Sequence, residues 1–141
     1  MDTLCLCTLC NLYTKHYLGE IMKNLRVALA QLNTTIGDFD SNIRLILDAG
    51  KKAKESDVDV VIFPELAITG YPPEDLLLRH SFINEAMTKL QLLAEQANSL
   101  PPLVVGCLDF KQHLYNSAAV LYEGKIQGIY HKQMLPNYGV F

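Results

Sequence analysis

The chain has 141 residues, half of them hydrophobic, with 19% charged residues and a formal net charge of −3. This composition predicts one folded domain with a sizeable core and argues against a disordered chain. The mildly acidic balance argues against a nucleic-acid-binding surface, which is usually basic. No apolar run reaches the roughly 20 residues of a membrane-spanning helix, so we expect a soluble, cytoplasmic protein that binds neither nucleic acid nor membrane.

The first part of the chain is rich in cysteine, with Cys5, Cys7 and Cys10 close together. Thiolates bind zinc, and His16 is the nearby candidate for a fourth ligand. Zinc knuckles pair one C-x-x-C with a second ligand pair, and no second pair follows here at a usual distance, so no metal site is expected. The stretch also lacks the positive start of a signal peptide. We expect residues 1–21 to be a dispensable or non-native extension and 22–141 to form the domain.

The first predicted unit is β-α-β. Residues 27–32 and 60–63 are short apolar runs typical of buried strands. Between them, Asp40 or Ser41 is expected to cap a helix. The apolar residues of this helix recur at spacings of three and four: Ile43, Ile46, Leu47, Gly50 and Ala53. A helical crossover of this length favours a parallel or mixed pairing of the two strands.

A second helix is predicted after the proline-rich loop at 71–73 and a short helical turn at 75–78. Ser81 is expected to cap this helix, and Pro101 and Pro102 should end the helical region. Its inward-facing residues are predicted to be Phe82, Ala86, Leu90, Leu93 and Ala97.

The remaining strands are predicted at 103–107, 116–122 and 125–130. The last two flank Glu123 and Gly124, which suit the turn of an antiparallel hairpin. We expect a mixed sheet of four or five strands with both helices on one face. Cys107, which ends an apolar run, is predicted to be a small core residue rather than a reactive thiol.

Two charged residues stand at strand ends, where α/β folds place their chemistry. Glu65 follows the strand at 60–63, and Lys132 follows the last strand. If both meet in one pocket, the carboxylate can accept a proton while the ammonium stabilises an oxyanion. The alternatives are that Glu65 only anchors its loop, or that the two residues form a structural ion pair.

Longer motifs contain these two residues. The sequences F-P-E-L at 63–66 and H-K-x-x-L-P at 131–136 resemble the nitrilase, or carbon–nitrogen hydrolase, superfamily. Within it, residues 65–77 and 132–141 are similar to the amino-terminal glutaminase domain of glutamine-dependent NAD(+) synthetases. The resemblance covers 22–141.

The resemblance implies a four-layer α-β-β-α sandwich of the α/β class, of which this chain would hold about the first half. One sheet face would then be partly bare. It also implies a glutamine amidotransferase in which Glu65 matches the general base and Lys132 the oxyanion-stabilising residue. Tyr138 matches a position lining the glutamine pocket, and Tyr71 is expected at its rim or near the ammonia exit. Loop packing is the alternative for both tyrosines.

In this family a cysteine attacks L-glutamine and releases ammonia, which a carboxy-terminal synthetase domain uses to amidate nicotinic acid adenine dinucleotide. ATP and magnesium belong to that second domain, and the intact enzyme is expected to be a homo-oligomer. The nucleophilic cysteine of the family follows the lysine motif, and this chain ends before it. Cys107 precedes Lys132 and cannot replace it. We therefore expect a truncated, inactive chain that holds no cofactor of its own.

Two other interpretations are kept. Another amidase of the same superfamily, an omega-amidase or an N-carbamoyl amidohydrolase, would share Glu65 and Lys132. A non-catalytic half-domain would instead bind a partner through its open sheet edge.

Overall fold

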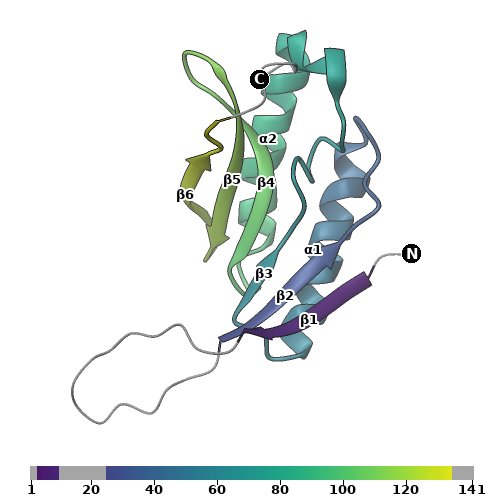
Figure 1. Ribbon diagram of the computed structural model, residues 1–141, viewed down its shortest axis with the longest axis vertical. Coiled ribbons are helices and arrows are strands. Elements are labelled where there is room, and N and C mark those ends of the chain that lie inside the picture. Colours follow the sequence, from purple (N-terminus) through teal and green to yellow (C-terminus); the bar gives the residue numbers. More distant parts are fainter. Residues whose placement is uncertain (1–2, 10–24, 135–141) are drawn as a thin grey trace, which may run out of the picture.

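The computed structural model of the protein describes residues 3–9 and 25–134, with side chains for 25–134 (Figure 1). The described residues form one six-stranded sheet in the order β1-β2-β3-β4-β5-β6. The strands are β1 (Thr3–Leu9), β2 (Leu25–Gln31), β3 (Val60–Ile62), β4 (Leu103–Phe110), β5 (Leu114–Tyr122) and β6 (Lys125–His131). The prediction of four or five strands was wrong, because β1 comes from the stretch interpreted as an extension.

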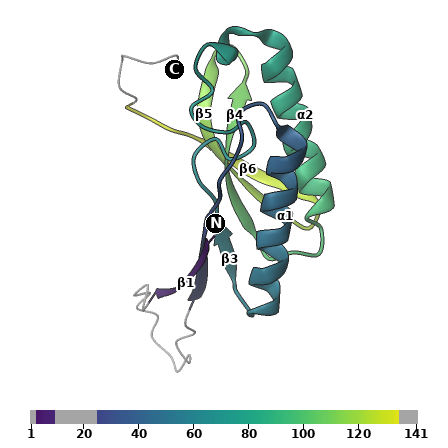
Figure 2. The same cartoon turned by 90° about the vertical axis from the view of Figure 1, so that its right-hand side faces the viewer.

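The sheet is mixed. Its centre is parallel, with β2 beside β3 and β3 beside β4. The outer pairs β1–β2, β4–β5 and β5–β6 are antiparallel. The helices α1 (Phe39–Glu55) and α2 (His80–Gln96) are the two crossovers, and both cover the same face of the sheet (Figure 2). The predicted β-α-β unit and the single helical layer are confirmed.

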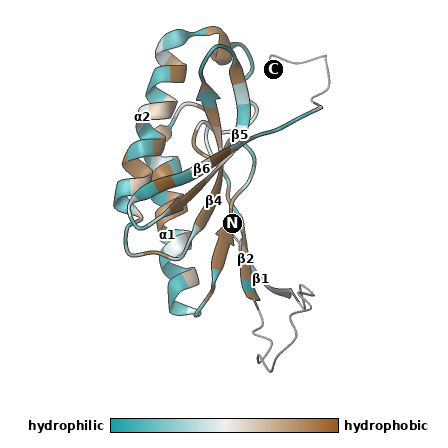
Figure 3. Cartoon of the chain, turned by 90° about the vertical axis from the view of Figure 1, so that its left-hand side faces the viewer, coloured by the Kyte–Doolittle hydropathy of each residue, from teal (hydrophilic) through white to brown (hydrophobic). Residues whose placement is uncertain are grey.

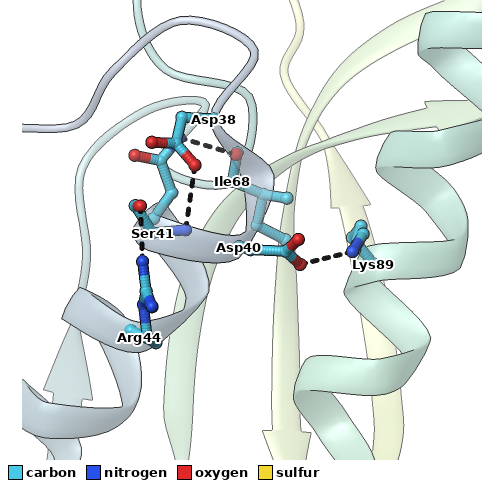
Figure 4. A network of polar contacts seen from close by, with 7 residues as sticks. Asp38, Asp40, Ser41, Arg44, Ile68 and Lys89 are labelled. Atoms are coloured by element: carbon cyan, nitrogen blue, oxygen red, sulfur yellow. Dashed lines mark hydrogen bonds and ion pairs between the residues drawn. The ribbon is translucent and has the colours of Figure 1, made fainter.

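The N-cap of helix α1 lies earlier in the chain than predicted. Asp38, and neither Asp40 nor Ser41, is the N-cap, because Asp38 Oδ1 accepts a hydrogen bond from the Ser41 backbone N–H at 3.1 Å. Asp40 lies in the first turn, where its carboxylate pairs with Lys89 of α2 (Figure 4). A carboxylate there also suits the positive end of the helix dipole. One acidic residue thus starts α1, and the other joins it to α2.

Helix α2 differs from its prediction at both ends: it ends at Gln96 with Ala97 as its C-cap, before Pro101 and Pro102. It begins at His80 after an N-cap Arg79 that makes no side-chain capping bond, so Ser81 lies inside the helix. A five-residue 3-10 helix, η1 (Glu74–Leu78), leads into it, as expected for 75–78. All five predicted inward-facing residues are buried: Phe82, Ala86, Leu90, Leu93 and Ala97.

The core lies between the helices and one face of the sheet. Strand alternation sends every second side chain to that face, and the resulting core residues include Val61, Leu103, Val105 and Leu121, all fully buried. None of the helices in the described part of the chain is long and apolar enough to cross a membrane.

The opposite face, here called the open face, carries no helix in the described residues. A row of paired apolar residues crosses it from β2 to β5: Leu29, Ile62, Val104 and Val120. Three of these, all but the half-buried Val104, are exposed, and hydrophobic colouring covers much of the strands (Figure 3). For the part of the chain that the structure describes, the predicted partly bare sheet face is confirmed.

The β5–β6 hairpin forms at the predicted turn. Glu123 and Gly124 have φ values of 51° and 74°, the left-handed pair that a tight two-residue hairpin turn needs. This hairpin brings the end of β6 back beside β5, and Lys132 follows it.

Candidate active site at the end of the third strand

The loop after β3 passes unusually close to β4. At Gly106 of β4, a Cβ atom would lie 2.3 Å from the Pro64 carbonyl oxygen and 2.7 Å from Glu65 Cα. Only glycine leaves room for this backbone approach. The next residue of the loop, Leu66, has φ 50° and is buried. The close packing and the left-handed turn together direct Glu65 away from the core.

The far end of the same loop is held by buried polar groups. The Asn42 side chain of α1 donates to the Ile68 and Thr35 carbonyl oxygens at 3.0 and 2.8 Å, and it accepts from the Thr35 N–H at 2.9 Å. The Thr69 hydroxyl donates to the Leu66 carbonyl at 3.1 Å. Asn42 and Thr69 are fully buried, so the loop that carries Glu65 is fixed by the core and not by solvent-exposed contacts.

Glu65 and Lys132 meet, although 67 residues separate them in the chain. Lys132 Nζ lies 3.0 Å from Glu65 Oε1. The Asn116 side-chain amide of β5 donates to the same carboxylate oxygen. The condition set in the sequence analysis, that the two charges meet, is therefore fulfilled, whereas their chemical roles stay predictions.

The contacts of Glu65 decide its protonation state. Partial burial acts to raise its pKa, but the hydrogen bonds from Asn116 and Lys132 and the Lys132 charge outweigh burial and hold the pKa below its ordinary value of 4.5. The side chain is 40% exposed. Glu65 is therefore ionised at neutral pH, the form in which a carboxylate can accept a proton.

A hollow of about 300 Å³ lies on the open face beside this pair. It is lined by Ile62, Phe63, Glu65, Val104, Gly106, Asn116, Ser117, Ala118, Tyr130 and Lys132. The exposed walls are mostly apolar, and three polar lining residues, Glu65, Asn116 and Lys132, contact one another; small-molecule sites commonly combine apolar walls with a few polar groups.

Sequence reasoning missed Asn116 and Tyr130. The pairing of Ala118 with Tyr130 places Tyr130 on the open face beside the hollow. A signal for Asn116 was available: it is a polar residue at the start of an apolar strand, two positions before Ala118, and so on the same face. The sequence did not show the strand pairing that brings this residue within hydrogen-bonding distance of Glu65.

The roles expected for Tyr71 and Tyr138 stay predictions. Tyr71 is 60% exposed and is not among the residues that line the hollow. Its role at a rim stays a prediction. Tyr138 lies outside the described residues.

Cys107 is a core residue, as predicted. It is buried, and burial together with the nearby Asp109 charge raises the pKa of its thiol to about 12. Because strand alternation turns Cys107 to the opposite face from Gly106, its thiol points away from the hollow. Among the described side chains, no three His, Cys, Asp or Glu residues cluster as a metal site would require, and Cys5, Cys7, Cys10 and His16 are outside those described.

The end of β6 is also held on the helix-covered face. His131 Nε2 lies 2.7 Å from Asp109 Oδ2, and the His131 ring stacks on Tyr115 with a centroid distance of 4.0 Å. Lys111 Nζ is 3.7 Å from the same Asp109 oxygen. Adjacent residues 131 and 132 are therefore anchored on opposite faces of the sheet, which limits the freedom of the backbone that carries Lys132.

A family model described as carbon-nitrogen hydrolase matches residues 26–140 of this chain. The chain belongs to the carbon-nitrogen hydrolase family. Its homologues are glutamine-dependent NAD(+) synthetases. The synthetase of Thermotoga maritima is 48% identical over 121 residues, which are 85% of this chain and 21% of that protein. The chain thus spans about a fifth of the length of such curated relatives.

Solved structures agree with this assignment. The glutamine-dependent NAD(+) synthetase of Acinetobacter baumannii, in complex with ADP, is 40% identical and superimposes with a TM-score of 0.69 over 82% of this chain and 22% of that one. An amidase from Nesterenkonia sp. superimposes with a TM-score of 0.63 over 80% of this chain and 44% of the amidase, at 24% identity, which supports the fold alone. The described sheet and helical layer are two layers of the predicted nitrilase-like sandwich.

Proposed function

We propose that this chain supplies the general base and the oxyanion-stabilising cation of a glutaminase site that serves a glutamine-dependent NAD(+) synthetase. The observation that carries the proposal is the Glu65–Lys132 pair at 3.0 Å, set at the edge of a hollow on the open face. The similarity to NAD(+) synthetases over 85% of the chain supports this branch of the family over the other amidases.

The reaction would use the pair as follows. Glu65 accepts the thiol proton of a cysteine, whose Sγ then bonds to the side-chain amide carbon of L-glutamine. The Lys132 ammonium stabilises the negative charge that develops on the amide oxygen. When the C–N bond breaks, the proton held by Glu65 passes to the leaving nitrogen, which departs as ammonia. Water then hydrolyses the thioester, and glutamate is released.

The nucleophile in this proposal is not Cys107, because a buried thiol whose pKa is about 12 is neither accessible nor ionised. We therefore place the nucleophile outside the described residues. ATP and magnesium would act in the synthetase part of the whole protein, where ammonia is added to nicotinic acid adenine dinucleotide. The described residues contain no acidic cluster that fits such a metal, so no step here passes through these groups. A cytoplasmic location and a homo-oligomeric whole enzyme remain part of the proposal.

A chimera tests the proposed roles directly. Residues 25–134 of this chain would replace the matching segment of the Thermotoga maritima relative, and NAD(+) formation would be measured with glutamine or with an ammonium salt as nitrogen source. We expect Glu65→Gln and Lys132→Met to lower glutamine-dependent synthesis by at least about 100-fold, the usual scale of a lost acid–base or oxyanion group. Ammonia-dependent synthesis should be unchanged.

The control is Glu55→Gln, which removes an exposed carboxylate at the end of α1 and should leave both activities unchanged. Loss of both activities in Glu65→Gln would instead indicate a structural role. Full glutamine-dependent activity in that variant would contradict the proposal.

The 141-residue chain alone should hydrolyse no glutamine, because the described site contains a base and a cation but no accessible thiol. Glutamate release can be followed by a coupled dehydrogenase assay at high protein concentration. Sustained release by the purified chain, absent in Glu65→Gln, would contradict the expected inactivity.

A further inference from the structure

We propose that Asn116 is the positioning residue of the site: its side chain orients the Glu65 carboxylate while its backbone holds the start of the segment that carries Lys132. The catalytic significance of this role rests on the proposed function, whereas the hydrogen bonds from which it is inferred do not depend on that function. Neither the sequence motifs nor the family resemblance assigned a role to Asn116.

One residue makes both contacts. The Asn116 Nδ2 group donates to Glu65 Oε1, and the Asn116 carbonyl oxygen accepts from the Lys132 backbone N–H at 2.8 Å. The loop after β3 and the end of β6 are thereby both bound to the same residue of β5. The side chain of Lys132 contacts Glu65 directly, because its Nζ lies 3.0 Å from the same Oε1 atom.

The location of Asn116 makes it a firm support. It is buried, with 5% of its surface exposed, and it pairs with Leu108 of β4 inside the eight-residue β4–β5 ladder. A side chain held in a sheet interior keeps its direction better than one on a loop, and residues that lock catalytic groups work best from such positions. By contrast Lys132 is 51% exposed and lies just after the end of β6.

The amide is also the right chemical group. An amide NH₂ donates without carrying charge, so it can occupy one carboxylate oxygen without competing with Lys132 for the role of counter-ion. Both described contacts fall on Oε1, and they leave the lone pairs of Oε2 for proton transfer. An isosteric carboxylate at position 116 could only accept, so it would repel Glu65.

The wild-type protein offers a first test that needs no substitution. In the full 141-residue chain, the Asn116 side-chain ¹⁵N and ¹H shifts are expected to titrate with the Glu65 carboxyl ¹³C shift, with one common midpoint. Glu65→Gln should abolish this titration. Lys132 and Tyr130 are the other titratable side chains that line the hollow, and neither is a carboxyl group, so the carboxyl ¹³C signal reports on Glu65 itself. An Asn116 side chain whose shifts ignore Glu65 would overturn the proposal.

Variants give the size of the effect. Asn116→Ala removes the donor and should raise the Glu65 midpoint by about half to one pH unit, the equivalent of one net hydrogen bond. Asn116→Asp should raise it further, by roughly one to three units, because two carboxylates would share the site. Asn84→Asp makes the same charge change at an exposed position of α2 and should leave the Glu65 midpoint unchanged. A folded Asn116→Asp protein with an unchanged Glu65 midpoint would overturn the proposal; if that variant does not fold, the wild-type titration decides.

The chimera separates this inference from the proposed function. Asn116→Asp should move the acid limb of its glutamine-dependent pH profile to higher pH and leave ammonia-dependent synthesis unchanged. Suppose that the chimera is inactive with glutamine while the Asn116 and Glu65 shifts of the 141-residue chain titrate together. That result would refute the proposed glutaminase function but support the hydrogen bond between Asn116 and Glu65. An active chimera whose acid limb is insensitive to Asn116→Asp would refute the positioning role alone.

Discussion

At the scale of single residues, the Glu65–Lys132 pair is held in place but remains open to water. The two side chains are 40% and 51% exposed, so solvent screening limits the pair to about 1 kcal/mol or less of stability. The pair therefore contributes little to the stability of the folded state. Its close geometry matters for chemistry, where an ionised carboxylate beside a cation is needed.

The pH dependence of this pair can be predicted with its sign. Because the fold lowers the Glu65 pKa below 4.5, the pair contributes stability above that pH and loses it as the pH falls through the folded value. Glu65→Gln should therefore reduce the free energy of unfolding by up to about 1 kcal/mol at neutral pH and by almost nothing at strongly acidic pH, below the folded pKa. Urea unfolding at the two pH values measures this, and an equal loss at both would mean that Glu65 packs rather than pairs.

Sequence reasoning could find Glu65 and Lys132 because each directly follows an apolar strand, a local signal. The signal for Asn116, a polar residue at the start of an apolar strand, did not show which residue it contacts. Its role depends on the register that sets β5 between β4 and β6, and on the backbone approach at Gly106, both of which join residues far apart in the chain. Tyr130 was missed for the same reason: its strand was predicted, but the sequence did not show which side chains of that strand point to the open face.

At the scale of elements, the close passage of the β3 loop over β4 depends on one missing side chain. Gly106→Ala would place a methyl group 2.3 Å from the Pro64 carbonyl oxygen and 2.6 Å from the Leu66 nitrogen. Both are backbone atoms of a loop fixed by the core, so relief requires a shift of the loop. We expect a loss of roughly 1–3 kcal/mol, typical of overpacking, and displacement of Glu65 from Lys132.

The chain contains a matched control for this substitution. A Cβ atom added at Gly128 of β6 would meet no atom within 4 Å, so Gly128→Ala should change the free energy of unfolding by less than about 0.5 kcal/mol. Denaturant unfolding of both variants provides the comparison. Equal effects would show that the alanine side chain itself, and not the approach of the loop, causes the loss.

The helices were predicted well in their interiors and less well at their starts. The apolar periodicity that predicts the interior of α1 and α2 is carried by many residues, whereas the prediction of an N-cap depends on one side chain. In α1 three neighbouring residues, Asp38, Asp40 and Ser41, could each accept a backbone N–H. In the fold Asp38 is the cap, and Asp40 pairs instead with Lys89 of the other helix. No comparable information was present in the local sequence.

At the scale of the whole molecule, the described residues form two layers, one of helices and one of strands. The sequence pattern predicted both helices on one face of a mixed sheet, and the family resemblance implied that the other face would be partly bare. It did not predict β1, whose residues were interpreted as an extension. As β1 they pair along the full length of β2, from Thr3 opposite Gln31 to Leu9 opposite Leu25. Whether this stretch is dispensable stays a prediction.

The open face should dominate the solution behaviour of the isolated chain. Its exposed row of Leu29, Ile62 and Val120 is contiguous across paired strands, and contiguous apolar patches bind dyes and promote association. Leu29→Lys should therefore lower both the fluorescence of bound anilinonaphthalene sulfonate and the weight-average mass in sedimentation. Leu92→Lys is the matched control: Leu92 is 37% exposed against 41% for Leu29, but it lies on α2, away from the row. Equal responses of the two variants would indicate that total surface hydrophobicity, and not the open face, governs association.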